Sequence, residues 1–429
     1  MTGQPAWYVR TPFFYGWAIV AAAFFANLIS TGVQLWSLSV LVVPMLDELA
    51  DWSRADVFGA MTVRSWIATV GTLLLGRYMD RRYGGMALMV AGGVLGGLSA
   101  GMAAFAHEPI EFMLWFGVVG GIAGPGQAYI VSNAIVSKWF VRRRAQALSL
   151  STMGTGAAAL VMPLAVTALI GVVGWRDTWL VLGIATVVIT VPLSLLMRRQ
   201  PEDVGLLPDG DEGVDAGGAA SRAAQERSFT ARQALRMPAT WLMAGAMTMA
   251  SVSILGLPTN LVPMLTDRGL GSEAAAGALT LYGAMSVAAR FGWGWVAQRT
   301  HVRTAVMLLG VYATVVTALF LAAGGLTPLL FVLAAGTGFA VGGIVVLNPL
   351  SWPTYFGREH VGAILAVVMP VTAIGGSTGP YIMAKAYDWT GDYAIGIAIL
   401  AVAWALCALL MRFAKPPSRA ALTPAPLPA

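Results

Sequence analysis

The sequence predicts an all-α integral membrane protein in which twelve transmembrane helices form two pseudo-symmetric six-helix halves. The composition excludes a soluble protein, because 58% of the 429 residues are hydrophobic and only 11% are charged. Uncharged stretches long enough to cross a bilayer recur along the chain, and two short motifs recur at nearly the same spacing. These observations together predict the fold class.

The uncharged stretches give the order of the spans, since a helix needs about 20 apolar residues to cross a bilayer. Backbone groups in lipid must form their hydrogen bonds within the segment, so each span is expected to be a helix. In the first half the spans lie within residues 11–46, 56–79, 83–107, 112–137, 145–175 and 178–197. In the second half they lie within residues 237–266, 272–298, 304–357, 360–384 and 393–411. The stretch 304–357 is long enough for two spans, and GGLTP at 324–328 predicts a turn between them.

Composition also predicts the domain boundaries. We expect a first six-helix half at 1–198, a cytoplasmic linker at 199–237, a second half at 238–413 and a disordered cytoplasmic tail at 414–429. The linker is polar, and we expect it to be disordered apart from a short amphipathic helix near 229–236.

The distribution of lysine and arginine predicts the orientation in the membrane. Placing both termini in the cytoplasm leaves 20 of the 26 basic residues on that side and two inside spans. The other four lie outside: Arg54, Arg176, Arg268 and Lys385. This asymmetry follows the positive-inside rule and predicts a multi-pass protein of the cell membrane. Because the basic residues are scattered over many short loops, the net charge of +6 does not indicate a nucleic-acid partner.

The sequence gives no support to enzymatic or metal-binding chemistry. Cys407 is the only cysteine and the three histidines fall at span ends, so no metal site is expected. The spans hold no central acid or histidine suited to catalysis, and the chain lacks a phosphate-binding P-loop. We therefore expect neither an enzyme nor a bound cofactor.

Two motif pairs indicate that the halves are duplicated. GRYMDR at 76–81 follows the second span, and GWVAQR at 294–299 follows the eighth, 218 residues later. WFVR at 139–142 precedes the fifth span, and YFGR at 355–358 precedes the eleventh, 216 residues later. Duplicated parallel halves are typical of transporters that expose a midplane site alternately to the two sides of the membrane.

Over its whole length the sequence resembles the major facilitator superfamily. GRYMDRRYGG at 76–85 resembles that family's Gly-x-x-x-Asp-Arg loop, which implies a gating role for Asp80 and Arg81. KWFVRRRAQALSLSTMGTG at 138–156 resembles the signature of the monocarboxylate transporters within that superfamily. TYFGREHVGAILAV at 354–367 and GPYIMAKAYDWTGDY at 379–393 also resemble that family.

The resemblance implies a secondary active transporter that moves small organic anions, above all monocarboxylates, by alternating access across a bacterial inner membrane. The implied partners are the anion, protons and membrane lipids, with the protein a monomer. Arg142, Arg143 and Arg144 either gate the cavity by pairing with carboxylates such as Asp80 or only anchor the chain at anionic lipid headgroups. Efflux of larger amphipathic compounds through the same fold is the alternative function.

Arg290 in the eighth span is the first candidate for binding the anion. No acidic residue lies within 274–289, while Tyr282 and Ser286 share its helix face at intervals of four residues. A planar guanidinium can hold a carboxylate through two hydrogen bonds, although snorkelling to the membrane surface is the other reading. In the family that the chain resembles, an arginine at the matching place binds substrate, and an aspartate common one turn earlier is replaced here by Ser286. Coupling by proton symport and by anion exchange therefore both stay open.

Arg64 in the second span is the other cation inside the membrane. It either pairs with Asp56 or Asp51 as an extracellular gate, or lines the pathway and attracts anions. If Arg64 and Arg290 both face the cavity, the protein could instead carry a dicarboxylate.

Polar residues in other spans suggest further substrate contacts, or else hydrogen bonds between helices. Gln127 lies on a different helix face from Tyr129 and Asn133 and is not among the candidates. The candidates are Asn27 and Gln34 in the first span and Tyr129 and Asn133 in the fourth.

Overall fold

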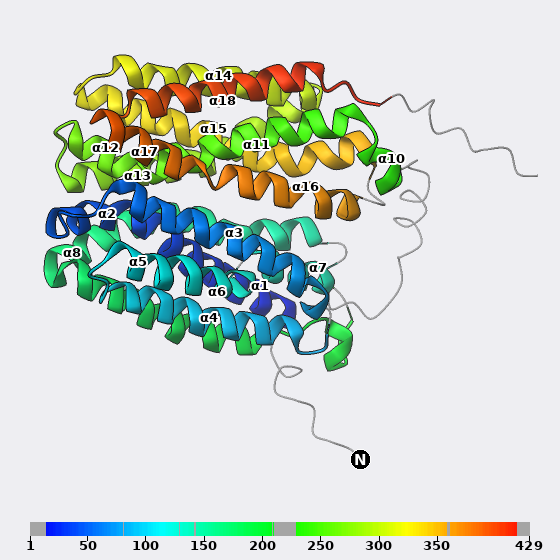
Figure 1. Ribbon diagram of the computed structural model, residues 1–429. Coiled ribbons are helices and arrows are strands. Elements are labelled where there is room, and N and C mark those ends of the chain that lie inside the picture. Colours follow the sequence, from blue (N-terminus) through cyan, green and yellow to red (C-terminus); the bar gives the residue numbers. More distant parts are fainter. Residues whose placement is uncertain are drawn as a thin grey trace, which may run out of the picture. The chain divides into compact units, whose positions relative to one another are not determined.

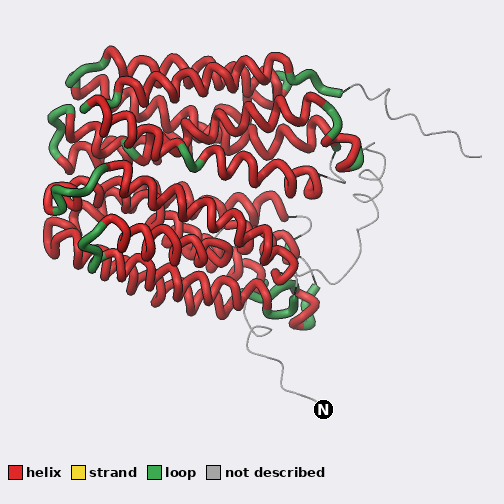
Figure 2. The backbone as a smooth tube through the Cα atoms, in the orientation of Figure 1, coloured by secondary structure: helices red, strands yellow, loops and turns green. Residues whose placement is uncertain are grey.

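A computed structural model describes residues 14–79, 81–127, 129–140, 143–207, 209, 229–357 and 361–417. Within these ranges the side chains of thirteen residues are not described, Tyr129 and Arg144 among them. The described residues form helices joined by short turns and contain no strand (Figure 2). The predicted all-α class is confirmed.

Nine helices among the described residues are long and apolar enough to cross a membrane by themselves. The other three predicted spans are also helical, but none of them is a separate helix that is both long and apolar. One shares the continuous helix α8 with its neighbour, one is the less apolar helix α13 (Ser272–Arg299), and one is divided into α16 (Val361–Gly376) and α17 (Gly379–Thr390). The structure thus accounts for twelve spans.

The fifth and sixth spans meet at a glycine. Helix α8 is assigned to Arg144–Leu196, but Gly174 inside it has φ 78° and ψ 172°. A residue with a β-carbon is strained at positive φ, so glycine allows the chain to reverse direction here without that strain. The turn comes close to where the sequence placed the boundary, between 175 and 178.

The chain forms two compact units, the first built from residues 14–209 and Thr259–Gly283. In it, helix α8 packs along both α1 and α4 (Figure 1). A hydrophobic core cluster of this unit contains Trp139 and Phe140, whose rings contact Phe14. Its elements are α1 (Tyr15–Thr31), the π-helix η2 (Gly32–Trp36), α2 (Ser37–Glu48), α3 (Arg54–Met79), α4 (Gly84–Ala103), α5 (Pro109–Phe112), the π-helix η3 (Met113–Val119), α6 (Gly120–Gln127), α7 (Tyr129–Trp139), α8, the 3-10 helix η4 (Pro201–Val204), α12 (Leu261–Asp267) and the start of α13.

The second unit contains residues 229–258 and the described residues from 284 onwards. Helix α14 packs against α15 and α18, and the Tyr355 hydroxyl donates a hydrogen bond of 2.7 Å to the carbonyl of Ala414. The short helix expected near 229–236 is α10, at Ala231–Leu235, with Thr230 as its N-cap. The remaining elements are α11 (Pro238–Thr259), most of α13, α14 (Val302–Ala322), α15 (Thr327–Phe356), α16, α17 and α18 (Ala394–Phe413).

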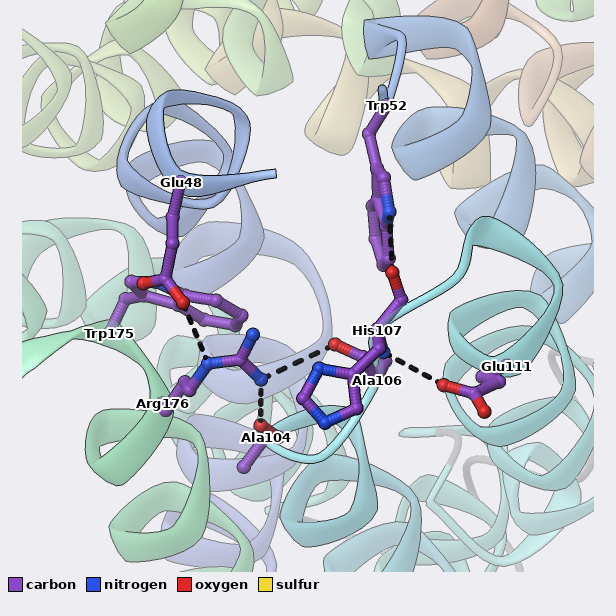
Figure 3. A network of polar contacts seen from close by, with 8 residues as sticks. All are labelled: Glu48, Trp52, Ala104, Ala106, His107, Glu111, Trp175 and Arg176. Carbon is purple, nitrogen blue, oxygen red and sulfur yellow. Dashed lines mark hydrogen bonds and ion pairs between the residues drawn. The ribbon is translucent and has the colours of Figure 1, made fainter. Parts of the chain in front are cut away.

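A polar network ties together the helix ends of the first unit that are predicted to face away from the cytoplasm (Figure 3). Glu48 at the end of α2 accepts hydrogen bonds from Trp175 Nε1 at 2.7 Å and from Arg176 Nε at 3.1 Å. Arg176 also donates to the carbonyls of Ala104 and Ala106 just after α4. One arginine therefore satisfies carbonyls left open at the end of a neighbouring helix, where no further helical turn can donate N–H groups to them.

An ion pair joins the segment Thr259–Gly283 to the rest of the first unit. Arg54 at the start of α3 contacts both carboxylate oxygens of Asp267 at the end of α12, at 2.8 and 2.9 Å. The two side chains are only 11% and 31% exposed, so water screens this pair less than a fully exposed one. Trp36 and Tyr282 add a ring contact between the same parts of the chain, with centroids 5.6 Å apart.

Reversing the charges of this pair is expected to show how much the pair contributes to the free energy of unfolding. Arg54→Asp should lower the free energy of unfolding by about 1 kcal/mol, and adding Asp267→Arg should restore most of the loss. Thermal unfolding of the purified protein in detergent measures both variants. If the double variant is no more stable than Arg54→Asp alone, packing of α12 on α2 holds the segment and the ion pair does not.

Candidate functional site

Two π-helical segments of the first unit contribute to the same polar cluster. η2 carries Gln34 and η3 carries Phe116, and both reach the surroundings of Arg64. π-helical turns are rare and occur often at functional sites, because the wider turn changes which backbone groups are available. We call Arg64, Gln127, Gln34 and Phe116 the Arg64 cluster.

Arg64 lies well inside the membrane-spanning part of α3. It follows Arg54, the first residue of the helix, by ten positions, or about 15 Å at 1.5 Å per residue. The residue is 5% exposed, and its Cζ lies 4.8 Å from the centroid of the Phe116 ring. Nη1 donates to the carbonyl of Phe116 at 3.4 Å, and Nη2 donates to Oε1 of Gln127 at 3.1 Å.

The acceptors around Arg64 are neutral. Arg64 forms no ion pair with a carboxylate among the residues that the structure describes. Its Nε is buried without a hydrogen-bond partner within the described part of the chain. Asp56 instead accepts hydrogen bonds from the backbone and hydroxyl of Ser53, at 2.9 and 2.7 Å. In this conformation Arg64 is thus not the partner of Asp56 that one reading of the sequence expected.

Gln127, like Phe116, belongs to the Arg64 cluster but is not among the candidates that the sequence predicts. It is 8% exposed at the end of α6, and its Oε1 accepts hydrogen bonds from both Arg64 Nη2 and Gln34 Nε2. Because an arginine has only donors, the amide oxygen has to be the atom that faces Arg64. The Ser30 hydroxyl also donates to the backbone carbonyl of Gln127, at 3.2 Å.

Two glycines leave the space that these side chains occupy. A β-carbon at Gly120 would lie 2.4 Å from Nη1 of Arg64, and one at Gly96 would lie 1.8 Å from Nε2 of Gln127. Both distances are far shorter than a van der Waals contact. The small residues of α4 and α6 therefore let a long cation and an amide lie side by side among closely packed helices.

Asn27 and Asn133 belong to a second polar cluster between helices of the first unit. Asn27 is 3% exposed, donates to the carbonyl of Ser151 at 3.0 Å and accepts from the hydroxyl of Ser132 at 3.2 Å. The Ser151 hydroxyl donates to Oδ1 of Asn133 at 3.1 Å. These contacts join α1, α7 and α8, which is the interhelical role that the sequence left open beside substrate binding.

The polar stripe expected on the eighth span lies on α13. Tyr282 is 2% exposed, Ser286 is 8% exposed and Arg290 is half-buried. A β-carbon at Gly342 would lie 2.1 Å from the carbonyl oxygen of Ser286, so α15 approaches α13 closely at this point. Arg290 lies nine residues before Arg299, the end of the helix, which is about 13 Å along the axis.

Several predicted residues lie partly or wholly outside the described residues. Asp80 and Arg142 are outside them, and for Tyr129 and Arg144 only the backbone is described. Arg81 is exposed, with its Cζ 5.2 Å from the centroid of the Tyr78 ring. Arg143 is exposed, and its backbone N–H donates to Asp209 at 3.3 Å. The gating roles of these residues stay predictions.

The Arg64 cluster has the chemistry of an anion site. A guanidinium provides five N–H donors, of which Arg64 uses two, and charge-assisted hydrogen bonds to a carboxylate are roughly twice as strong as neutral ones. Within the described residues no group of three His, Cys, Asp or Glu side chains is placed to hold a metal ion. Fixed positive charge and hydrogen-bond donors are therefore what this part of the protein offers a ligand.

Comparison with known proteins agrees with a transporter. A family model described as Major Facilitator Superfamily matches residues 20–300 and 256–428. Monocarboxylate transporter 11 of Homo sapiens is 30% identical over 402 residues, covering 88% of this chain and 78% of the relative. Monocarboxylate transporter 12 of Xenopus laevis is 23% identical over 421 residues, covering 94% of this chain and 89% of the relative.

Solved structures show the same fold at low sequence identity. One is a bacterial homologue of the human lysosomal transporter Spinster, in an inward-facing and occupied conformation, with a TM-score of 0.68, 15% identity and coverage of 94% of this chain and 97% of that one. Another is a D-xylose-proton symporter, also with a TM-score of 0.68 and 15% identity, covering 92% and 97%. The chain is a membrane transporter of the Major Facilitator Superfamily, related to the monocarboxylate transporters.

Proposed function

We propose that the protein is a secondary active transporter that moves small organic anions, above all monocarboxylates, by alternating access. The observation that carries this proposal is the buried guanidinium of Arg64, which has only neutral acceptors and no carboxylate partner among the described residues. The names of the relatives, which are monocarboxylate transporters, support the same substrate class.

The charge of Arg64 carries an energetic cost inside the membrane. An arginine at the centre of a spanning helix costs about 2.5–3.5 kcal/mol on insertion scales, and such residues commonly mark ion and substrate pathways. A fixed carboxylate would offset that cost permanently, whereas a substrate anion offsets it only while bound. Fixed positive charge also disfavours cations in the same place, which gives selectivity by charge.

Arg290 is the second residue that we assign to the anion. It lies on one face of α13 with Tyr282 and Ser286, well away from both helix ends. Its planar fork suits a carboxylate, and Tyr282 and Ser286 supply hydroxyls for the rest of a hydroxy or keto acid. The resemblance to the monocarboxylate transporters, in which an arginine at the matching place of the eighth span binds substrate, supports this assignment.

Further features of the proposed transport cycle follow from the sequence. We assign residues 1–198 and 238–413 to the two moving halves, with both termini in the cytoplasm of a bacterial cell. Ser286 stands where the monocarboxylate transporters commonly have an aspartate that carries a proton. Proton symport therefore needs another acid here, and anion exchange is the other mode of coupling. Anionic lipid headgroups at the basic loops and a monomeric state complete the proposal.

Uptake into proteoliposomes tests the substrate class. We expect saturable uptake of labelled lactate or pyruvate, and stabilisation of the purified protein against heat by the same acids. Methyl lactate, which lacks the carboxylate, is the matched control and should give no stabilisation.

Each other outcome supports a different function. Stabilisation by dicarboxylates but not by monocarboxylates would favour a carrier that uses both Arg64 and Arg290. Equal stabilisation by lactate and by methyl lactate would contradict the anion proposal and favour efflux. The same holds if no acid stabilises the protein and cells that express it resist amphipathic drugs.

A further inference from the structure

The Oε1 atom of Gln127 occupies the position at Arg64 where an anion would be expected. It accepts a charge-assisted hydrogen bond of 3.1 Å from Arg64 Nη2 and a second hydrogen bond from Gln34 Nε2. A carboxylate oxygen could accept hydrogen bonds from the same two donors. The amide, however, brings one oxygen and no charge, whereas a carboxylate brings two oxygens and a full negative charge.

We propose that Gln127 is a place-holder that satisfies Arg64 when the transporter is empty and gives way to the substrate carboxylate when it is loaded. This inference rests on the proposed function, since it names the residue with which the transported anion competes. Binding then exchanges one neutral acceptor for a charged one, and Nε of Arg64, which is buried without a partner among the described residues, gains an acceptor.

The surroundings of Gln127 suit a side chain that moves. It is the last residue of α6, two positions after Pro125, a residue that cannot donate a helical hydrogen bond. No hydrogen bond within the described residues holds its Nε2. The amide group fills the space beside Gly96, which lacks a side chain. Gln34, the other donor to Oε1, is on the π-helical turn η2 and stays available to the incoming carboxylate.

A place-holder has a use in a carrier that must return empty. Without an acceptor, the guanidinium of the empty protein would be buried with unsatisfied donors, which is costly in a low-dielectric interior. The Gln127 amide supplies an acceptor at that stage. Because the substrate has to displace it, the amide also lowers net affinity, which favours release of the anion on the far side of the membrane.

Two substitutions of similar shape separate this role from a merely structural one. Gln127→Glu gives Arg64 a permanent carboxylate, so the empty protein should unfold at a higher temperature than wild type. The lactate concentration that gives half-maximal stabilisation should rise at least roughly tenfold, because the substrate must compete with a tethered anion. Gln127→Met removes the acceptor, so the empty protein should unfold at a lower temperature and that lactate concentration should fall about threefold.

The measurement is thermal unfolding of each purified variant over a series of sodium lactate concentrations, with methyl lactate as the neutral control. Gln200→Glu makes the same chemical change in the segment after α8 and should leave the lactate response at the wild-type level. If both Gln127 variants shift the unfolding temperature but keep the wild-type lactate response, Gln127 is structural and the inference is overturned. If Gln127→Glu does not fold, the methionine variant alone decides. A wild-type protein that responds to no carboxylate overturns the proposed function itself, and the place-holder with it.

Discussion

Replacing Arg290 by alanine is expected to reduce lactate uptake into proteoliposomes by about 100-fold or more, which corresponds to about 2.7 kcal/mol of lost binding. The loss follows from removing both the charge and the forked donor pair from the polar face of α13, with Tyr282 and Ser286 left in place. Arg290→Lys keeps the charge but presents a single ammonium, so we expect a smaller loss, roughly tenfold and expressed mainly in KM.

The control for Arg290 is an arginine outside the spans. Arg232 is exposed on the short helix α10, and Arg232→Lys should leave uptake unchanged. Equal uptake by wild type and Arg290→Lys would show that the bidentate geometry is not used. Uptake that survives Arg290→Ala would place anion binding elsewhere, with Arg64 as the remaining cation inside a span.

Arg64→Met is the second substitution with a large expected effect, and it should lower transport without lowering stability. Methionine fills a similar elongated space without charge, and its introduction removes the cost of burying a charge that has only neutral acceptors. The Gln127 amide keeps Gln34 as a hydrogen-bond donor. We therefore expect an unfolding temperature equal to or above that of wild type, together with lactate uptake lowered by about 100-fold.

This combination distinguishes an anion site from a structural cation. If Arg64 mainly joins α3 to η3 and α6 through Phe116 and Gln127, its loss should lower the unfolding temperature and reduce uptake only as far as the folded fraction falls. Arg232→Met on α10 controls for loss of a positive charge in general. Normal uptake by a well-folded Arg64→Met protein would remove Arg64 from the proposed site.

The predicted spans agree closely with the helices because a spanning helix is a run of consecutive apolar residues, which the sequence shows directly. The turn expected at 324–328 is present between α14, which ends at Ala322, and α15, which begins at Thr327. The boundary expected between 175 and 178 is close to the turn at Gly174. The sequence predicts the eleventh span as one stretch at 360–384, whereas the structure divides it into α16 and α17 between Gly376 and Gly379.

The site was harder to predict because its contacts run between helices. The spacing in one helix shows which residues share a face, but not what that face meets. Gln127 shares no helix face with Tyr129 and Asn133, so spacing does not group it with them, yet it accepts hydrogen bonds from residues 63 and 93 positions earlier in the chain. Asn27 looked equally suited to substrate and to structure, and its partners on α7 and α8 favour the structural role.

The sequence alone determined that the chain is a twelve-span helical transporter with two cations inside its spans, since the bilayer selects for length, apolarity and the position of charge along each segment. Only the tertiary structure decided what surrounds Arg64. The neutral acceptors from η3 and α6, the space left by Gly96 and Gly120, and the contact of the Gln127 amide with Arg64 depend on how separate helices pack, which no periodicity within a single helix records.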